Sequence, residues 1–303
     1  MKNRFEMISK IVKKIKQRKL IIRNMRDINS LIRTEVKIEQ LQYMALNSDR
    51  PLIADECQLG SPVIVSLTTF SKKIHEVHLA IESIAQQSIR PDKIILWLDE
   101  DEFAMENIPS ILIKQINRGL EVKFFSNIKS YKKIVPTLII FPDSYIITID
   151  DDVLYANNMI DILVKEQNRF PKMIIGHRGH RMTFDGANLP KPYKQWDYDV
   201  NDDIGSHNIM LTGCGGIIYP PKSLHLDATK IDIFQKLSPN ADDLWLKVMA
   251  IKNDTRCKKT EHSDGGLALK GHRNIGLAQM NVKNGGNDQQ LKKLIEYYKI
   301  KFD

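Results

Sequence analysis

Two groups of adjacent acidic residues stand out as candidates for chemistry. The first is Asp150-Asp151-Asp152, which directly follows the apolar run "YIITI". Three adjacent carboxylates repel one another, and burying their charge costs free energy unless a cation compensates it. Mg²⁺ and Mn²⁺ prefer oxygen ligands and take few of them from the protein, completing their shell with phosphate oxygens and water. The triplet therefore predicts a divalent-cation site, with an acidic turn or helix cap as the plainer alternative.

The second group is Asp242-Asp243, in the stretch "NADDLWL" at the expected start of a helix. An aspartate in that position can accept a proton from a hydroxyl group whose oxygen attacks an electrophile. The alternative is helix capping, because acidic side chains in the first turn interact favourably with the helix dipole. Both interpretations remain open at the level of the residues.

Regular structure must position these acidic groups, and the apolar pattern predicts it. Short apolar runs rich in β-branched residues predict four buried strands, at 63–70, 93–98, 120–126 and 145–149. Apolar residues at helical spacing predict helices between them, at 74–88, 108–118 and 131–141. This alternation predicts an α/β fold with a doubly wound, mainly parallel sheet. Ligands of such sheets bind outside the carboxyl ends of the strands, where we expect Thr68, Phe70, Asp99 and the aspartate triplet.

The second half of the sequence is less regular. We expect a strand that leaves into a basic loop at 172–182, a long polar functional loop at 190–208 and a strand interrupted by glycines at 209–221. Helical patterns follow at 238–253 and 287–302.

The order of the four strands and the Asp150–Asp152 triplet resembles the nucleotide-sugar-binding half of a GT-A glycosyltransferase. The resemblance is to the family 2 type or to a bacterial surface-polysaccharide relative, and it covers roughly residues 60–250. It implies a GT-A catalytic domain over 62–303, with a nucleotide-sugar-binding half at 62–155 and an acceptor-binding half with the C-terminal helix at 156–303. The implied enzyme is a hexosyltransferase-type glycosyltransferase that uses Mn²⁺ or Mg²⁺.

The resemblance also implies the substrates and the reaction. The donor would be a nucleotide diphosphate sugar, with a UDP-sugar expected, and the acceptor a hydroxyl group of a glycan or lipid-linked glycan. Direct attack would invert the anomeric centre, and the reaction would belong to cell-surface polysaccharide biosynthesis.

Individual residues take roles from the same resemblance. Asp152 would bind the metal, Asp150 the ribose or the metal, and His262 would be a third metal ligand. One residue of the Asp242-Asp243 pair would be the general base, with Asp243 slightly preferred. The residues expected to bind the nucleotide sugar are Thr68, Phe70, Asp99, Lys132, Lys133, Asp150, Asp151, Gly215 and Gly216.

The positive charge of the chain is concentrated at one end. Residues 1–30 hold ten basic and two acidic residues, a net +8 that equals the formal charge of all 303 residues. A nucleic-acid-binding protein would more often spread its basic residues over one face, so we expect no nucleic-acid partner. Residues 1–48 are predicted to form a basic amphipathic helix, and residues 49–61 a linker. The helix, through residues 1–45, is expected either on an anionic membrane surface or against the body or another subunit.

The remaining composition bears on localisation. Hydrophobic residues make up 42% and charged residues 27%, as in ordinary globular proteins, and no run of 18 apolar residues occurs. Three scattered cysteines, Cys57, Cys214 and Cys257, favour a reducing compartment. We therefore expect a cytoplasmic protein, peripheral on the inner face of the plasma membrane if the basic helix binds lipid.

Two alternative functions remain. A sugar nucleotidyltransferase also uses a doubly wound sheet and a metal-binding carboxylate, but its first strand is usually followed by a glycine-rich basic signature that "TTFSKKIHEV" lacks. A non-catalytic, membrane-associated scaffold built around the basic helix would leave both acidic groups unexplained.

Overall fold

The computed structural model describes residues 2–54, 59–202, 204–261, 266–269, 281–282 and 285–302. Within these ranges, seven strands form a central sheet in the spatial order β10-β6-β9-β4-β1-β2-β3. The strands are β1 Val63–Thr68, β2 Lys93–Asp99, β3 Leu120–Phe125, β4 Tyr145–Thr148, β6 Ile174–Gly176, β9 Ile217–Tyr219 and β10 Cys257–Lys259.

The pairing of the strands confirms the predicted α/β fold. β1 lies parallel to β2 and β4, β2 is parallel to β3, and β6 is parallel to β10. Only β9, within the described part of this sheet, runs antiparallel to both of its neighbours, β4 and β6. The sheet is therefore mainly parallel, as the alternation of strands and helices predicts.

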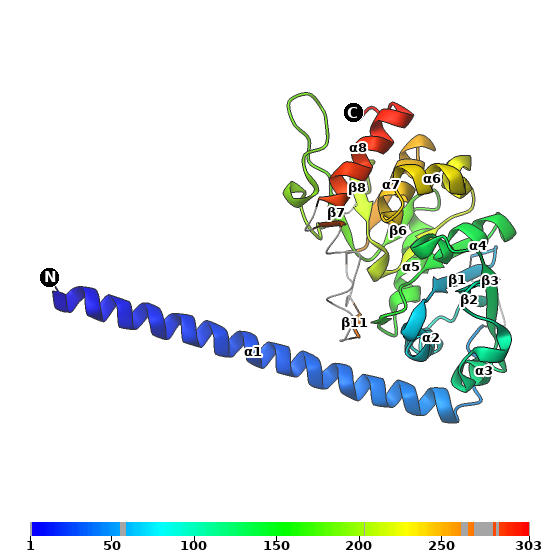
Figure 1. Ribbon diagram of the computed structural model, residues 1–303, viewed down its shortest axis with the longest axis horizontal. Helices are drawn as coiled ribbons and strands as arrows, with labels where there is room; N and C mark the ends of the chain where they lie inside the picture. Colours follow the sequence, from blue (N-terminus) through cyan, green and yellow to red (C-terminus); the bar gives the residue numbers. More distant parts are fainter. Residues whose placement is uncertain are drawn as a thin grey trace.

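Helices lie on both faces of the sheet (Figure 1). They are α2 Val77–Ala85, α3 Ser110–Ile116, α4 Val135–Ile140, α5 Met159–Arg169, α6 Ile231–Leu237, α7 Asp242–Lys252 and α8 Gly286–Tyr298. Successive side chains of β1 point to opposite faces of the sheet. Val65 packs in a core with α2, α3 and α5, whereas Ile64 packs with Trp97 on the opposite side. On that second side, Ser66 Oγ and Thr137 Oγ1 of α4 lie 2.8 Å apart in a hydrogen bond. Because both faces are covered, β1 is apolar at most of its positions, and the hydroxyl of Ser66 has a hydrogen-bond partner.

The second half contains two small antiparallel sheets. β7 (Gly179–Arg181) pairs with β8 (Ile209–Leu211), and β5 (Val153–Leu154) pairs with β11 (Leu267–Ala268). The expectation that the strand at 172–182 leaves into a basic loop is therefore wrong, because its basic part is β7. Three residues are too few to show a strand period in the sequence. The expectation of a strand interrupted by glycines is confirmed, since a 3₁₀ turn at Gly213–Gly215 separates β8 from β9.

Residues Lys2–Asn47 form the single helix α1, which extends far beyond the rest of the protein (Figure 1). Its C-terminal end contacts α2 and α3, and Leu41 and Ala45 are buried there. The segment predicted as a linker is partly packed as well: Leu52 is buried and donates its N–H to the carbonyl of Arg118 at 2.8 Å. Among the described helices, none combines the length and the apolarity needed to cross a membrane.

Candidate active site

The aspartate triplet lies in the turn between β4 and β5, at the carboxyl end of the central strand β4. The hydroxyl of Tyr155 accepts a hydrogen bond from the N–H of Asp150 at 2.9 Å and helps to fix this turn. The side chains of Asp150 and Asp152 are 30% and 36% exposed, whereas Asp151 is 9% exposed. The outer two carboxylates are thus available to a ligand, and the middle one is largely enclosed.

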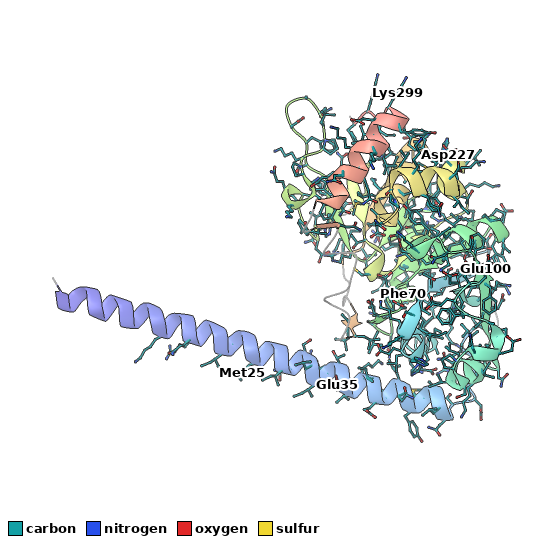
Figure 2. The ribbon with its side chains drawn as sticks, viewed as in Figure 1. Met25, Glu35, Phe70, Glu100, Asp227 and Lys299 are labelled. Carbon is teal, nitrogen blue, oxygen red and sulfur yellow. The ribbon has the colours of Figure 1, made fainter. Side chains whose placement is uncertain are left out.

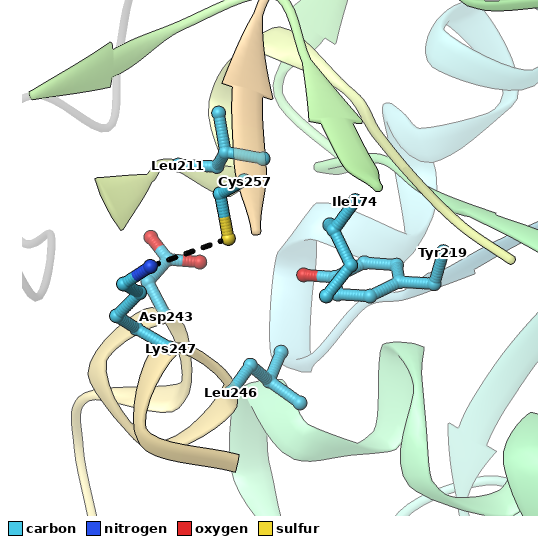
Figure 3. Close-up of a pocket in the computed structure, with 7 residues that line it drawn as sticks. All are labelled: Ile174, Leu211, Tyr219, Asp243, Leu246, Lys247 and Cys257. Atoms are coloured by element: carbon cyan, nitrogen blue, oxygen red, sulfur yellow. Dashed lines mark hydrogen bonds between the residues drawn. The ribbon is translucent and has the colours of Figure 1, made fainter. Parts of the chain in front are cut away.

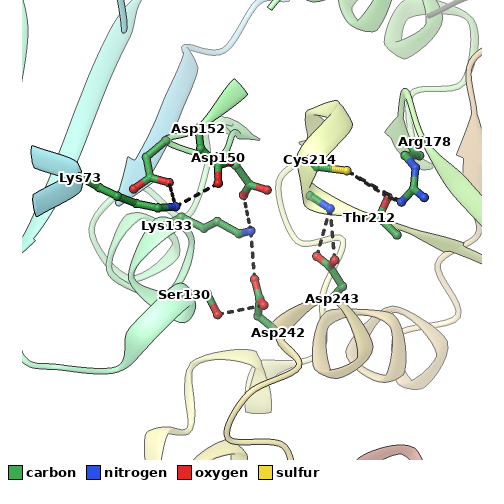
Figure 4. A network of polar contacts seen from close by, with 12 residues as sticks. Lys73, Ser130, Lys133, Asp150, Asp152, Arg178, Thr212, Cys214, Asp242 and Asp243 are labelled. Carbon is green, nitrogen blue, oxygen red and sulfur yellow. Dashed lines mark hydrogen bonds and ion pairs between the residues drawn. The ribbon is translucent and has the colours of Figure 1, made fainter. Parts of the chain in front are cut away.

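Lys73 forms ion pairs with the middle and the last aspartate, and Figure 4 shows the one with Asp152. Its Nζ lies 2.9 Å from Oδ1 of Asp151 and 3.0 Å from Oδ2 of Asp152, while Thr69 donates its hydroxyl to Oδ2 of Asp151 at 2.7 Å. Burial raises the pKa of Asp151, although Lys73 and Thr69 stabilise its charged form. Burial works to lower the pKa of Lys73, but attraction to the two carboxylates outweighs it and the pKa is raised. Asp151 therefore has protein partners on both of its oxygens.

Lys133 connects the two acidic groups that the sequence singles out. It ends a 3₁₀ turn at Lys129–Lys133, and its Nζ lies 2.9 Å from Oδ1 of Asp150 and 3.1 Å from Oδ2 of Asp242 (Figure 4). Although burial favours the neutral amine, Asp150, Asp242 and Asp243 hold the pKa of Lys133 well above its ordinary value. A permanently charged ammonium therefore lies between the aspartate triplet and the start of α7.

The two aspartates of α7 differ in their surroundings. Asp242 accepts a hydrogen bond from Ser130 Oγ at 2.9 Å in addition to the ion pair with Lys133. Asp243 accepts the backbone N–H of Gly213 at 3.2 Å from each carboxylate oxygen. Burial and the charge of Asp242 raise the pKa of Asp243 to about 7, with Lys133 opposing the shift. A group with this pKa exchanges a proton near neutral pH, as a general base must.

A small pocket lies behind Asp243 and contributes to its burial (Figure 3). The pocket is lined by Ile174, Leu211, Tyr219, Asp243, Leu246, Lys247 and Cys257. Lys247 points its Nζ toward Cys257 Sγ, 3.4 Å away, and burial lowers the pKa of this lysine. The mostly apolar lining adds to the burial of Asp243, and burial is the largest cause of its raised pKa.

The glycine nearest to the acidic groups is Gly213. A Cβ at this position would lie 2.7 Å from Nζ of Lys133 and 3.4 Å from Oδ1 of Asp243. The predicted glycines lie elsewhere: a Cβ on Gly215 would meet Arg178 at 3.0 Å, and Gly216, with φ of +87°, faces Met159. Gly213 belongs to the same run, "TGCGG". The sequence therefore indicates this run, but not which of its glycines lies beside the acidic groups.

The other predicted donor-site residues lie near the strand ends but make different contacts. Thr68 donates its hydroxyl to the carbonyl of Trp97 at 2.9 Å, and Phe70 is 55% exposed. Asp99 and Lys132 are both buried and form an ion pair of 3.1 Å with each other. The structure therefore brings Lys133, and not Lys132, to the aspartates. His262 lies outside the described residues.

Asp150 and Asp152 offer the oxygen donors that a divalent cation requires. Both are partly exposed carboxylates, and hard oxygen ligands fit Mg²⁺ or Mn²⁺. Within the described ranges, which do not include His262, no three His, Cys, Asp or Glu side chains are placed to hold a metal. Two carboxylates are fewer ligands than a divalent cation takes, so an ion held by Asp150 and Asp152 would need further oxygen ligands from water or substrate.

Comparisons with known proteins complete the description. No family model and no curated protein matches the chain. Among solved structures, the chain is similar to S. aureus TarS 1–349, with 14% identity and a TM-score of 0.45 over 77% of this chain and 70% of that one. It is also similar to a CMP:2-keto-3-deoxy-manno-octonic acid synthetase in complex with CTP, with 9% identity and a TM-score of 0.41 over 74% and 100%. Both TM-scores are below 0.5, so neither similarity assigns a family or an activity.

Proposed function

We propose that this protein is a metal-dependent glycosyltransferase that moves a sugar from a nucleotide diphosphate sugar to a hydroxyl group of a glycan or lipid-linked glycan. The observation that carries the proposal is the link made by Lys133, whose Nζ contacts Asp150 on one side and Asp242 on the other. This link places the strand-end carboxylates close to Asp243, whose pKa is about 7. Such a transfer requires both a site for an anionic leaving group and a base.

The donor side is assigned to the aspartate triplet and its lysines. Asp150 and Asp152 would hold Mn²⁺ or Mg²⁺, and the ion would offset the charge that builds on the departing diphosphate. Lys73 and Lys133 add fixed positive charge beside the same carboxylates. A UDP-sugar is the proposed donor, following the resemblance of the sequence.

The acceptor side is assigned to Asp243. Its charged form would accept the proton of the attacking hydroxyl group, while the N–H of Gly213 holds the carboxylate in place. Asp242 would position Lys133 and Ser130 instead of taking the proton, because its carboxylate is the one of the two that forms the ion pair with Lys133. Direct attack by the acceptor would invert the anomeric centre. Cell-surface polysaccharide synthesis is the proposed setting.

Two measurements with a panel of nucleotide sugars test this proposal. Calorimetry first measures Mn²⁺-dependent binding, and an assay then measures transfer of the sugar. Asp152→Ala should abolish transfer and keep the far-UV circular dichroism of the wild type. The matched control is Asp161→Ala, which removes an aspartate paired with Lys165 on α5, away from the site.

Two outcomes would contradict the proposal. Full transfer by Asp152→Ala in the presence of a chelator would overturn the metal mechanism. Release of pyrophosphate from a nucleoside triphosphate and a sugar would identify the chain as a sugar nucleotidyltransferase instead.

A further inference from the structure

The helix α1 carries a row of largely exposed apolar side chains. Ile21, Met25, Ile28, Ile32 and Val36 are each more than half exposed. Their spacing of three or four residues places them along one side of the helix. Figure 2 shows Met25 on the part of α1 that extends away from the body. We call these five residues the apolar stripe of α1.

The same helix is anchored at its other end. Leu41 and Ala45 are buried against the body, and Lys114 of α3 donates its ammonium to the carbonyl of Leu46 at 2.8 Å. Gln42 bonds His78 of α2 through Oε1 and Nε2, 2.5 Å apart. The stripe therefore lies on a helix whose C-terminal end is packed against the body.

Basic positions occur on more than one side of α1. At 100° per residue, Arg33 and Lys37 lie away from the line of the stripe, whereas Lys14 and Arg18 lie close to it. Residues 1–30 carry a net +8, which is the whole formal charge of the protein. An exposed apolar row on a strongly basic helix is a combination found in helices that lie in a membrane interface.

We infer that α1 lies flat on an anionic lipid surface, with the apolar stripe turned into the bilayer. A second copy of the chain is the competing occupant, but pairing two such helices in parallel would bring two segments of net +8 side by side. Like charges at that density repel, whereas a lipid surface of negative charge attracts every one of them. Charge therefore favours the membrane over a parallel pairing of two copies.

Flotation of the full chain with vesicles tests this inference. Binding is expected with vesicles that contain about one third phosphatidylglycerol and not with vesicles of phosphatidylcholine alone, and it should weaken in 1 M salt. Changing Lys19, Arg23, Arg26 and Arg33 to glutamine should reduce the partition coefficient at least about a hundredfold, since each basic residue near such a surface contributes about fivefold. The charge-matched control changes the body residues Lys165, Lys172, Lys222 and Lys292 to glutamine and should bind normally.

A second pair of variants examines the apolar stripe. Changing Ile21, Met25, Ile28 and Ile32 to glutamine should abolish flotation, whereas changing the exposed body residues Leu189, Ile204 and Leu226 should not. Sedimentation in the absence of lipid gives the oligomeric state of each variant. Equal binding to neutral vesicles, unchanged binding by both α1 variants, or an oligomer that the stripe variant dissociates would each overturn the inference.

Discussion

The ammonium of Lys133 lies 2.9 Å from Oδ1 of Asp150, and this contact holds together two acidic groups that are far apart in the sequence. The same ammonium lies 3.1 Å from Asp242, and it lowers the pKa of Asp243 against the effect of burial. Without this cation, three carboxylates would face one another with no compensating charge. The position of Lys133 therefore determines both the spacing of the site and the proton affinity of its base.

Gly213→Ala should disturb Lys133 and leave the fold intact. The new Cβ would lie 2.7 Å from Nζ of Lys133, so the ammonium must move away from Asp150. We expect kcat/KM for transfer to fall at least about tenfold, because displacements near 1 Å in a catalytic group can cost about a hundredfold. Gly186→Ala is the control, since a Cβ there meets nothing within 4 Å. Unchanged kinetics with a normal melting temperature would show that Lys133 need not occupy this position.

Asp243→Asn should stabilise the protein in a pH-dependent manner while abolishing transfer. The pKa of Asp243 is raised from 3.8 to about 7, so between these values the folded protein binds more protons than the unfolded chain. Stability therefore falls as the pH rises from 3.8 to about 7, and asparagine avoids this loss. The difference in Tm between the variant and the wild type should be small at pH 4 and clearly positive at pH 8.

The catalytic readout of the same residue is the pH profile of the wild type. Transfer should rise with pH through about 7, as the base loses its proton, and Asp243→Asn should lower kcat by about 10²–10⁴-fold. Asp161→Asn is the control, because Asp161 lies on α5 and is paired there with Lys165. It should produce no pH-dependent change in Tm and no change in the rate of transfer. A stability difference that is the same at pH 4 and pH 8 would contradict the raised pKa.

The local sequence pattern predicts the strands and helices that carry the site. It does not predict which residues contact one another within the site. The strand at 145–149 and the helix start at Asp242-Asp243 are each defined by neighbouring residues, and both are confirmed. Lys73 reaches Asp151 across 78 residues of sequence, and Ser130 reaches Asp242 across 112. Such pairs depend on how strands and turns are packed, which no local spacing encodes.

The same limitation explains the outcome for Asp99 and Lys132. The resemblance predicts a role in nucleotide-sugar binding for each of the two residues separately. The fold brings them together, and their ion pair of 3.1 Å is 3% exposed on each side. A pattern in the sequence gives the charge of a residue near the rim of the sheet, but only the fold shows whether another residue neutralises it.

Lys73→Ala should strengthen binding of Mn²⁺ to the aspartate triplet. The lysine ammonium lies 2.9–3.0 Å from Asp151 and Asp152, so it repels any cation held by the same carboxylates. A unit charge about 4 Å away contributes about 1 kcal/mol even in a water-like environment, which corresponds to about fivefold in affinity. Calorimetric titration with Mn²⁺ in the absence of nucleotide measures the effect. Lys72→Ala, one residue away and exposed, is the control, and weaker Mn²⁺ binding by Lys73→Ala would show that the ion does not share these carboxylates.

Arg118→Met should destabilise the half of the fold against which α1 packs. Arg118 binds the fully buried Glu82 of α2 through two hydrogen bonds of 2.9 Å, and its Nε donates to the carbonyl of Arg50 at 2.7 Å. Removing the guanidinium leaves a buried carboxylate without its cation, which costs about 3–5 kcal/mol in the free energy of unfolding measured with urea.

Two further variants separate this charge effect from lost packing. Adding Glu82→Gln to Arg118→Met should restore part of the stability, because the remaining side chain is then neutral. Lys165→Met breaks the ion pair with Asp161, in which the lysine side chain is 70% exposed, and should cost no more than about 0.5 kcal/mol. A double variant less stable than Arg118→Met would show that Arg118 acts mainly through packing and its bond to Arg50, instead of through the charge of Glu82.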